Sequence, residues 1–361
     1  MPGQAWGARS WSNRGWADMA APPSTMRVSV LNAAHDLDVV ERPVPSPGRG
    51  EVLLQVASVG VCGSDIHYYE KGRIGTHVVE QPLVLGHEAS GRVAAVGEGV
   101  SQARMGQRVS VEPGATCREC EQCRAGRYNL CPDVRFLATP PVDGAFCEYL
   151  VVPASDAHPV PDSVGDDAAA LLEPLSVAVW SLRRSGVGIG TRVLVTGAGA
   201  IGLLTAQAAW AFGAAEVVVT DVDEARLAMA RSQGSRTVDV SVEPLAQVGY
   251  SPDVLVECSG NARATWDAVG TVARAGRVVL VGMGGDEVRL PLSYVQDREL
   301  QLIGSFRYAN TWPDAITLAA SGEVALDELV TSHHGLDDVE AALTAPATVP
   351  GTVKPVVQPG R

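Results

Sequence analysis

The sequence predicts an α/β protein with two domains, one built mostly of short β-strands and the other around a doubly wound parallel sheet. Three observations predict this fold. Residues 26–160 alternate short apolar runs with Gly and Pro breaks, which is typical of a barrel-like β region. From Arg192 onward, strands alternate with helices, which is typical of a parallel sheet. The length of 361 residues suits two domains, because one domain usually holds roughly 100–200 residues.

The β region begins with a regular strand-like pattern at Met26. Further strand-like runs are 51–59 (EVLLQVASV), 91–96 (GRVAAV) and 107–111 (QRVSV). Residues 1–25 carry three tryptophans among Arg, Gly, Ser and Pro, without the continuous apolar core of a secretory signal. For this segment we expect either a disordered extension or an upstream start codon, with the true start at Met19 or Met26.

In the middle of the chain, the strand-like pattern gives way to a predicted helix and then to strands that alternate with helices. Residues 166–184 are rich in Ala and Leu and predict a helix that Pro174 breaks or kinks. Strands are then predicted at 192–196, 216–220, 253–257 and 277–282, with an Ala-rich helix at 203–212. From about Asn310 the composition returns to that of the first region. We therefore expect residues 176–309 to form one domain, inserted between the two parts of the other, 26–175 and 310–361.

The composition excludes several classes of partner. The chain has 28 Lys and Arg against 41 Asp and Glu, a formal net charge of −13, so neither a nucleic acid nor an anionic membrane surface is expected to bind it. No stretch approaches the roughly 20 apolar residues that span a bilayer. Seven cysteines, four of them clustered, do not suggest a secreted disulfide framework. They favour thiol ligands in a reducing cytoplasm.

Residues 197–202 (GAGAIG) predict a dinucleotide-binding turn of the Rossmann type, because the motif follows a predicted strand and opens a helix. The first glycine permits a tight turn, the second lets a pyrophosphate approach the backbone, and the third allows close helix–strand packing. The helix N-terminus attracts the phosphates. The expected cofactor contacts here are Gly197, Gly199, Ala200, Ile201 and Gly202. The alternative is a strand–turn–helix unit that binds nothing.

Asp221, at the end of the next predicted strand, indicates which dinucleotide the turn accepts. Its carboxylate can accept hydrogen bonds from both hydroxyls of the adenosine ribose, and it would repel a 2′-phosphate. The sequence therefore favours NAD over NADP, although Arg226 is near enough to accommodate a phosphate. Val281, in the predicted strand 277–282, is a further expected cofactor contact.

A cluster with the spacing Cys-x2-Cys-x2-Cys-x7-Cys predicts a structural zinc site. Four thiolates close a tetrahedron around zinc and leave no position open for a substrate. The surrounding loop has little apolar core, so metal ligation would supply its order. The alternatives are a nucleic-acid-binding zinc module, which the acidic chain disfavours, and free surface thiols. The four residues are Cys117, Cys120, Cys123 and Cys131.

Three separate segments carry further residues of metal-ligating type. They are 60–67 (GVCGSDIH), 86–88 (GHE) and 172–174 (LEP). Taken singly, each has an ordinary structural explanation: a core cysteine, a solvated turn and a paired core carboxylate.

The order of these three segments, the cysteine cluster and the glycine turn resembles that of medium-chain zinc dehydrogenases, and most of all their polyol (sorbitol or L-iditol) branch. The resemblance runs from about Met26 to the end and is most specific at 62–97, 173–179 (EPLSVAV) and 306–312 (FRYANTW). It implies a GroES-like catalytic domain beside the Rossmann domain. It also implies oxidation of a polyol secondary hydroxyl to a ketose, with one catalytic zinc, one structural zinc and NAD.

The resemblance further implies a ligand set for the catalytic zinc. Cys62, His87 and Glu173 are the expected ligands, with water as the fourth. Glu88 is the expected second carboxylate that holds this water, and its own entry into the coordination sphere during turnover stays open. The alcohol dehydrogenase branch has Cys at the position of Glu173. A carboxylate there is a harder ligand, and it moves the expected substrate from a simple alcohol towards a polyol.

The remaining implied roles concern the proton and the substrate. Ser64 and His67 match the relay that carries the proton away, although His67 could instead be a structural turn histidine. Tyr68, Arg307 and Tyr308 match positions that line the substrate pocket.

Three rival functions stay open at this point. The first is a zinc dehydrogenase for threonine, butanediol or a simple alcohol. The second is a zinc-free quinone-type reductase, and the third is a catalytically silent NAD-binding protein. For assembly, the resemblance implies a homotetramer or homodimer that pairs through the edge of the cofactor sheet, with residues 288–294 (VRLPLSY) as a candidate contact.

Overall fold

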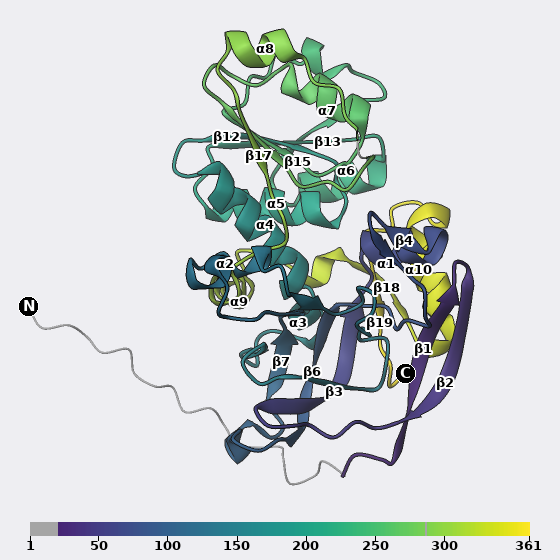
Figure 1. Ribbon diagram of the computed structural model, residues 1–361. Helices are drawn as coiled ribbons and strands as arrows, with labels where there is room; N and C mark the ends of the chain where they lie inside the picture. The colour runs from purple at the N-terminus through teal and green to yellow at the C-terminus, as the bar shows by residue number, and fades with distance from the viewer. Residues whose placement is uncertain (1–20, 286) are drawn as a thin grey trace, which may run out of the picture.

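The structure of the chain, a computed structural model, describes residues 21–285 and 287–361. It has a β-rich lobe and a lobe built on a parallel sheet, one above the other (Figure 1). The expectation for the first 20 residues lies outside the described residues. The first strand begins at Thr25, one residue before the start that the sequence pattern predicts.

A seven-stranded sheet forms the centre of the β-rich lobe. Its order is β11-β7-β6-β3-β19-β18, and β10 also pairs with β3. The strands are β3 (Glu51–Gly60), β6 (Glu88–Val96), β7 (Arg108–Val111), β10 (Tyr149–Pro153), β11 (Ala157–Pro159), β18 (Val330–His334) and β19 (Lys354–Val357). The C-terminal strand β19 therefore returns to pair with β3 in this sheet (Figure 1). Residues 176 and 310 as domain boundaries stay a prediction.

Three two-stranded sheets complete this lobe. They pair β1 with β2, β4 with β5, and β8 with β9. Their bounds are β1 (Thr25–Ala33), β2 (Asp36–Pro43), β4 (Arg73–Ile74), β5 (His77–Val78), β8 (Gly114–Ala115) and β9 (Arg135–Phe136). The lobe also contains helices α1 (Gly63–Lys71), α2 (Glu121–Arg124) and α10 (Val339–Thr348).

The second lobe is a six-stranded sheet in which all neighbouring strands are parallel, in the order β14-β13-β12-β15-β16-β17. The α/β fold class is therefore confirmed. Helices α5 and α6 lie on one face and α7 on the other (Figure 1), and this covering explains the nearly continuous apolar strands. The strands are β12 (Arg192–Thr196), β13 (Glu216–Asp221), β14 (Arg236–Asp239), β15 (Val254–Glu257), β16 (Arg277–Leu280) and β17 (Gln301–Gly304). The helices are α5 (Ala200–Ala211), α6 (Glu224–Ser232), α7 (Ala262–Val269) and α8 (Leu292–Asp297).

The helical stretch between the lobes differs from its prediction. Two helices, α3 (Asp166–Ala170) and α4 (Leu172–Ser185), replace a single helix, and the break lies at Leu171 instead of Pro174. A proline is tolerated in the first turn of a helix, but its ring clashes with the carbonyl four residues earlier. That carbonyl belongs to Ala170, so the earlier helix ends there. Helix α4 packs against α5 and against α9 (Trp312–Ser321).

Among the residues that the structure describes, no helix combines the length and the apolar character needed to cross a membrane.

Asp167, at the start of α3, links three other parts of the β-rich lobe. Its carboxylate accepts hydrogen bonds from Ser58 on β3 (2.5 Å) and from Gln358 after β19 (3.2 Å), and it pairs with His333 on β18 (2.6 Å). Burial raises the pKa of Asp167, but these three partners outweigh burial, so the pKa lies below its usual value of 3.8. The folded state therefore favours the ionised carboxylate.

We expect Asp167→Asn to lower the free energy of unfolding at pH 7 by about 1–2 kcal/mol. Because the pKa is depressed on folding, this stabilisation is present above the unfolded-state value and disappears as the pH falls through the folded-state value, below 3.8. Urea unfolding of the variant and the wild type at pH 7 and at successively lower pH measures the difference. The exposed Asp162→Asn is the control, and a difference that stays constant down to pH 3 would contradict the assignment.

Candidate active site

Helix α1 places Cys62 at the start of the site. Cys62 is the residue just before the helix, and its backbone N–H donates to the carboxylate of Asp65 (3.0 Å). This contact satisfies one of the free N–H groups at the helix start. Asp65 is fully buried and also accepts a hydrogen bond from the N–H of Gly86 (2.9 Å). Asp65 therefore fixes the segments of Cys62 and His87 relative to each other.

Cys62, His87 and Glu88 form one group of possible metal ligands. Their sulfur, nitrogen and oxygen atoms all lie within 4.8 Å of one another. His87 and Glu88 are buried at the start of β6, which runs beside the end of β3. The Nδ1 atom of His87 lies 3.7 Å from the carboxylate of Asp65, which orients the ring. A sulfur, a nitrogen and an oxygen ligand are a set that suits zinc.

The group differs from the expected ligand set in its carboxylate. The sequence resemblance placed Glu173 among the ligands and Glu88 beside them, whereas the structure groups Glu88 with Cys62 and His87. The reason is position along the chain: Glu88 directly follows His87 on the same strand, while Glu173 lies on α4 and accepts a hydrogen bond from Tyr308 (2.6 Å).

Lys354 is the partner of Glu88. Its ammonium donates to both carboxylate oxygens at 2.8 Å, and to the carbonyl of Val61 at 2.9 Å. Only 3% of Lys354 and 1% of Glu88 are exposed. Burial lowers the pKa of Lys354, but Glu88 and Cys62 outweigh burial and raise it, so the lysine stays charged. The ammonium thus offsets the cost of burying the Glu88 carboxylate.

Charge at the site favours a cation. Burial lowers the pKa of His87, but the neighbouring Cys62 and Asp65 outweigh burial, and the pKa stands well above its ordinary value. Burial, together with the charge of Glu88, raises the pKa of Glu173 to about 7 against the opposing effects of His87, Tyr308 and Lys354. A bound divalent cation would relieve this concentration of acidic groups.

The expected substrate residues lie next to this group. Burial, followed by the charge of Glu173, raises the pKa of Tyr308 well above its ordinary value, so the phenol stays a hydrogen-bond donor. The guanidinium of Arg307 lies 3.7 Å from the ring centroid of Phe136. Its Nη1 atom is buried and has no hydrogen-bond partner among the described residues. Tyr68 is also buried, on α1.

The two expected relay residues, Ser64 and His67, lie on the first two turns of α1 and are half-buried. Cys62 therefore stands directly before α1, and Ser64 and His67 follow within its first two turns.

The glycine turn has the geometry that its motif predicts. Gly197 has a positive φ of 84°, a Cβ on Gly199 would meet open space, and a Cβ on Gly202 would lie 1.7 Å from the carbonyl oxygen of Gly197. Gly202 therefore allows the close packing and Gly199 leaves room for a ligand. The half-buried Ala200 and Ile201 begin α5, three residues earlier than predicted.

A cavity of about 360 Å³ opens beside this turn and is lined by Gly197, Asp221, Asn261 and Arg263. Asp221 ends β13, and its carboxylate accepts hydrogen bonds from the backbone N–H groups of Ala198 (2.5 Å) and Val222 (2.7 Å). These contacts fix the carboxylate at the cavity wall. Asn261 and Arg263 belong to the start of α7, and no sequence pattern identified them.

Two expected cofactor residues, Arg226 and Val281, are not among the residues that line this cavity. Arg226 donates to the carbonyl of Thr352 (2.9 Å) and is not part of the cavity wall. Its side chain therefore contacts the C-terminal segment in this structure, and its role towards a phosphate stays a prediction. Val281 follows β16, and its N–H donates to the carbonyl of Glu257 (2.9 Å). The nearby Met283 reaches α1, because its methyl group would lie 4.0 Å from a Cβ on Gly63.

The four-cysteine cluster is assembled. The ligand atoms of Cys117, Cys120, Cys123 and Cys131 lie within 4.8 Å of one another. The N–H of Cys120 donates to the sulfur of Cys117 (3.3 Å), and the N–H of Cys123 donates to the sulfur of Cys120 (3.4 Å). The N–H groups of Glu119 and Cys120 lower the pKa of Cys117 to about 7. Such amide donors stabilise thiolates, the form that binds a metal.

Around the possible metal ligands, the sequence patterns did not identify Lys354 or Asp65. Lys354 lies in an apolar run near the C-terminus, and a lysine inside such a run was its only signal. Asp65 stands three residues after Cys62, the spacing at which an acidic side chain reaches back to the start of a helix.

The chain is similar to known dehydrogenases over most of its length. Residues 48–162 match the model of the alcohol dehydrogenase GroES-like domain, and residues 200–321 match the model of the zinc-binding dehydrogenase family. The sorbitol dehydrogenase of Bacillus subtilis is 41% identical, over 89% of this chain and 93% of that protein. The sorbitol dehydrogenase of Homo sapiens is 42% identical, over 88% and 91%. The crystal structure of L-idonate 5-dehydrogenase from Escherichia coli superposes with a TM-score of 0.86, at 30% identity, over 92% and 98%.

If Cys62, His87 and Glu88 hold the metal, substitutions of Glu88 and Glu173 should have different effects on the zinc content. Glu88→Gln should cost the chain one tightly bound zinc, because the neutral amide replaces the ionised carboxylate that a metal ligand requires. Glu173→Gln should keep the metal count of the wild type. Elemental analysis after dialysis measures both.

A control separates ligand loss from misfolding. Glu88→Gln leaves the Lys354 ammonium buried and unpaired, so the double variant Glu88→Gln/Lys354→Met tests the ligand alone. Full zinc content in the Glu88 variants with loss of one zinc in Glu173→Gln would reverse the assignment.

Proposed function

Since the chain belongs to the medium-chain zinc-dependent alcohol dehydrogenase superfamily, we propose that it oxidises a secondary hydroxyl of a polyol to a ketone, with NAD as the hydride acceptor. One observation favours a polyol over a simple alcohol as the substrate. Beside the Cys62–His87–Glu88 group lie a buried carboxylate–phenol pair, Glu173 and Tyr308, and the buried unpaired donor of Arg307. A simple alcohol would leave the Arg307 donor without a partner, whereas a polyol supplies a hydroxyl to it and further hydroxyls to the Glu173–Tyr308 pair.

We propose that Cys62, His87 and Glu88 hold the catalytic zinc. When bound, zinc supplies a Lewis acid that lowers the pKa of a substrate hydroxyl. Asp65 orients His87 and Lys354 holds Glu88, so both ligands are fixed by partners of their own.

Glu173 has a different role in this proposal. It faces the same group from α4, is buried, and receives the Tyr308 hydroxyl. Its raised pKa lets it exist with or without a proton near neutral pH, which suits a group that holds water or a substrate hydroxyl beside the metal. Ser64 and His67 remain the proposed route for the proton, because both lie on the helix that begins at Cys62.

Substrate orientation is assigned to Tyr68, Arg307 and Tyr308. The Arg307 side chain is held over Phe136, which leaves its buried Nη1 as a donor for a hydroxyl further along the carbon chain. Hydrogen bonds of this kind reject an analogue that lacks the hydroxyl, because the protein donor is then left unpaired.

The proposed cofactor site runs from the cavity at Asp221 to α1. The pyrophosphate would lie over Gly199, where the backbone is open, and the adenosine ribose against Asp221. The methyl group of Met283, in the segment after β16, would lie 4.0 Å from a Cβ placed on Gly63, so this segment runs near the metal-bearing helix. The nicotinamide end would therefore reach the substrate there.

The four-cysteine cluster is proposed to hold a structural zinc. Its four sulfurs would fill the coordination sphere of a bound zinc, and the amide donors at Cys117 stabilise its thiolate. The seven free cysteines of the chain support a reducing compartment such as the cytoplasm.

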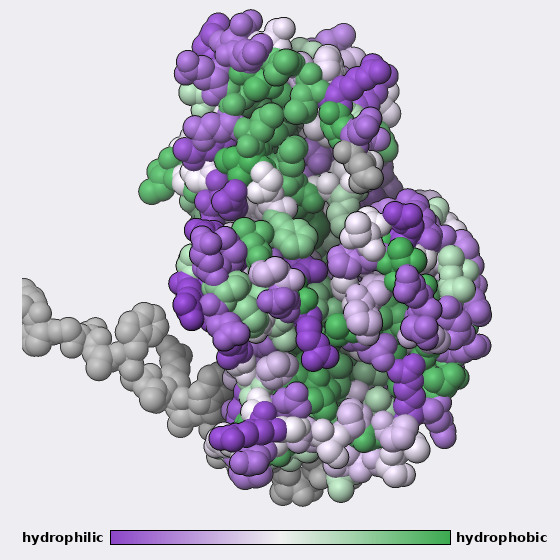
Figure 2. All heavy atoms as spheres, viewed as in Figure 1, coloured by the Kyte–Doolittle hydropathy of each residue, from purple (hydrophilic) through white to green (hydrophobic). Residues whose placement is uncertain are grey.

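For assembly, we propose a homodimer, or a homotetramer built from it, that pairs at strand β17. This strand has a neighbour on one side only, and Leu302 on it and Leu292 on α8 are exposed. Apolar side chains gather over this part of the parallel-sheet lobe (Figure 2). An exposed apolar strand edge is suited to pairing with a second copy. A monomeric mass in sedimentation would contradict this proposal.

The direct test is a substrate panel with the zinc-loaded protein and NAD. We expect sorbitol or xylitol to be oxidised with a higher kcat/KM than 2-propanol, butanediol or threonine. Arg307→Met should lower kcat/KM for the polyol about 10- to 100-fold, because a hydrogen bond from a charged donor is lost, and should change the 2-propanol value less. The exposed Arg49→Met is the control. A wild type that prefers threonine or 2-propanol would overturn the proposal.

Asp221 predicts the cofactor preference. Asp221→Ser should raise the ratio of NADP to NAD use about tenfold or more, because the carboxylate that repels a 2′-phosphate is removed. The ratio of kcat/KM for the two cofactors measures this effect. Glu224→Gln, which removes an exposed carboxylate outside the cavity wall, should leave the ratio unchanged. An equal ratio in Asp221→Ser and the wild type would contradict the role of Asp221.

A further inference from the structure

The turn formed by residues 306–310, called the substrate turn below, carries Arg307 and Tyr308 and contains residues in an unfavourable backbone conformation. Arg307 and Asn310 have positive φ angles of 49° and 56°. Residues other than glycine rarely adopt this region, and they stay there only where the surrounding structure holds them. Two such residues in five imply contacts that fix the turn from outside.

These contacts come from the cysteine loop, residues 113–132. The Asn129 side chain donates to the carbonyl of Phe306 (2.8 Å), and the Tyr128 hydroxyl accepts from the backbone N–H of Asn310 (2.7 Å). The Asn310 side chain donates to the carbonyl of Gly126 (3.0 Å). The loop therefore holds the substrate turn at both ends.

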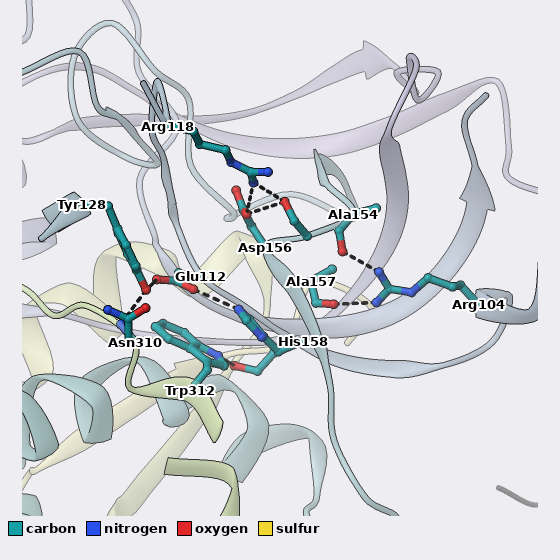
Figure 3. Close-up of polar contacts among 12 residues, drawn as sticks. Arg104, Glu112, Arg118, Tyr128, Ala154, Asp156, Ala157, His158, Asn310 and Trp312 are labelled. Carbon is teal, nitrogen blue, oxygen red and sulfur yellow. Dashed lines mark hydrogen bonds and ion pairs between the residues drawn. The ribbon is translucent and has the colours of Figure 1, made fainter. Parts of the chain in front are cut away.

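Tyr128 is itself held in place (Figure 3). Its hydroxyl donates to Glu112 (2.7 Å), and the other oxygen of Glu112 pairs with His158 (2.9 Å). The His158 ring stacks on Trp312, with 5.3 Å between the ring centroids. The Trp312 ring meets the ring of Tyr308 edge to face at 5.1 Å. The network that begins at the cysteine loop thus ends on a side chain of the substrate pocket.

The position of Tyr128 and Asn129 in the sequence adds to this argument. Both stand between Cys123 and Cys131, so ligation of these two cysteines to one metal would fix the backbone on either side of them. Asn129 is buried, with 6% of its surface exposed, although it lies in a loop with little apolar core. Its buried amide donates to the substrate turn and not within its own loop.

We propose that the cysteine loop, through Tyr128 and Asn129, positions the substrate turn and so sets the selectivity for polyols over simple alcohols. This inference rests on the proposed function. Tyr128 and Asn129 are positioning residues, because they act through Arg307 and Tyr308. The four-cysteine site then serves substrate recognition in addition to the stability of the loop.

The test compares two substrates in the zinc-loaded protein with NAD: a polyol, and 2-propanol, which lacks further hydroxyls. Tyr128→Phe and Asn129→Ala should each lower the ratio of the polyol kcat/KM to the 2-propanol kcat/KM about fivefold, mainly through the KM for the polyol. A role in folding alone would lower both values together. Zinc content and Tm are measured for each variant.

Two further variants make the result decisive. Tyr250→Phe removes an equally enclosed hydroxyl, one that donates to the carbonyl of Val193 in the parallel-sheet lobe, and should leave the ratio unchanged. Asn310→Gly deletes the tether to Gly126 from the opposite side, and glycine adopts the positive φ without strain. It should lower the ratio in the same direction, even if the loop variants fail to fold.

The outcomes separate the inference from the proposed function. A wild type that oxidises polyols, with an unchanged ratio in the folded variants Tyr128→Phe, Asn129→Ala and Asn310→Gly, overturns the inference alone. A wild type that does not oxidise polyols overturns the proposed function, and the inference with it.

Discussion

The buried ion pair between Lys354 and Glu88 is the contact on which the arrangement of the active site depends. The two residues are 266 positions apart, and both are almost fully buried. A lone carboxylate at this depth would be costly, and removing the lysine would leave that cost uncompensated. Strand β19 brings the lysine to the site because the C-terminal segment returns to pair with β3. The pairing of β19 with β3 therefore places the Lys354 ammonium where it compensates the negative charge of Glu88.

The two lobes contribute different parts of the chemistry. The β-rich lobe supplies the metal group from α1 and β6, while the parallel sheet supplies a ligand cavity at the carboxyl ends of its strands. Helix α4 carries Glu173 and packs against the parallel-sheet lobe through α5. The substrate turn follows β17, the last strand of the parallel sheet, and it contacts the cysteine loop of the other lobe. Substrate recognition thus depends on side chains from both lobes.

Local patterns in the sequence predicted much of this structure. The strand at 192–196, the glycine turn and the four-cysteine cluster lie where their spacing placed them, because each depends on neighbours in the chain. Contacts between distant segments were not visible. No local rule joins Lys354 to Glu88, nor decides whether Glu88 or Glu173 lies closer to Cys62 and His87. The same holds for Tyr128 and Asn310, which meet across 182 positions. The resemblance to a family named the residues that meet here, while the choice between Glu88 and Glu173 as the ligand stays a prediction.

A crystal structure of the zinc-loaded protein, with anomalous scattering measured at the zinc edge, tests the central claim most directly. The account predicts one anomalous peak among the four cysteines of the cluster. It predicts a second between Cys62, His87 and Glu88, with a Glu88 oxygen about 2.0–2.2 Å from the metal and Lys354 still bound to that carboxylate. A second peak coordinated by Glu173, with Glu88 bound to Lys354 alone, or no peak at this position in active protein, would contradict it.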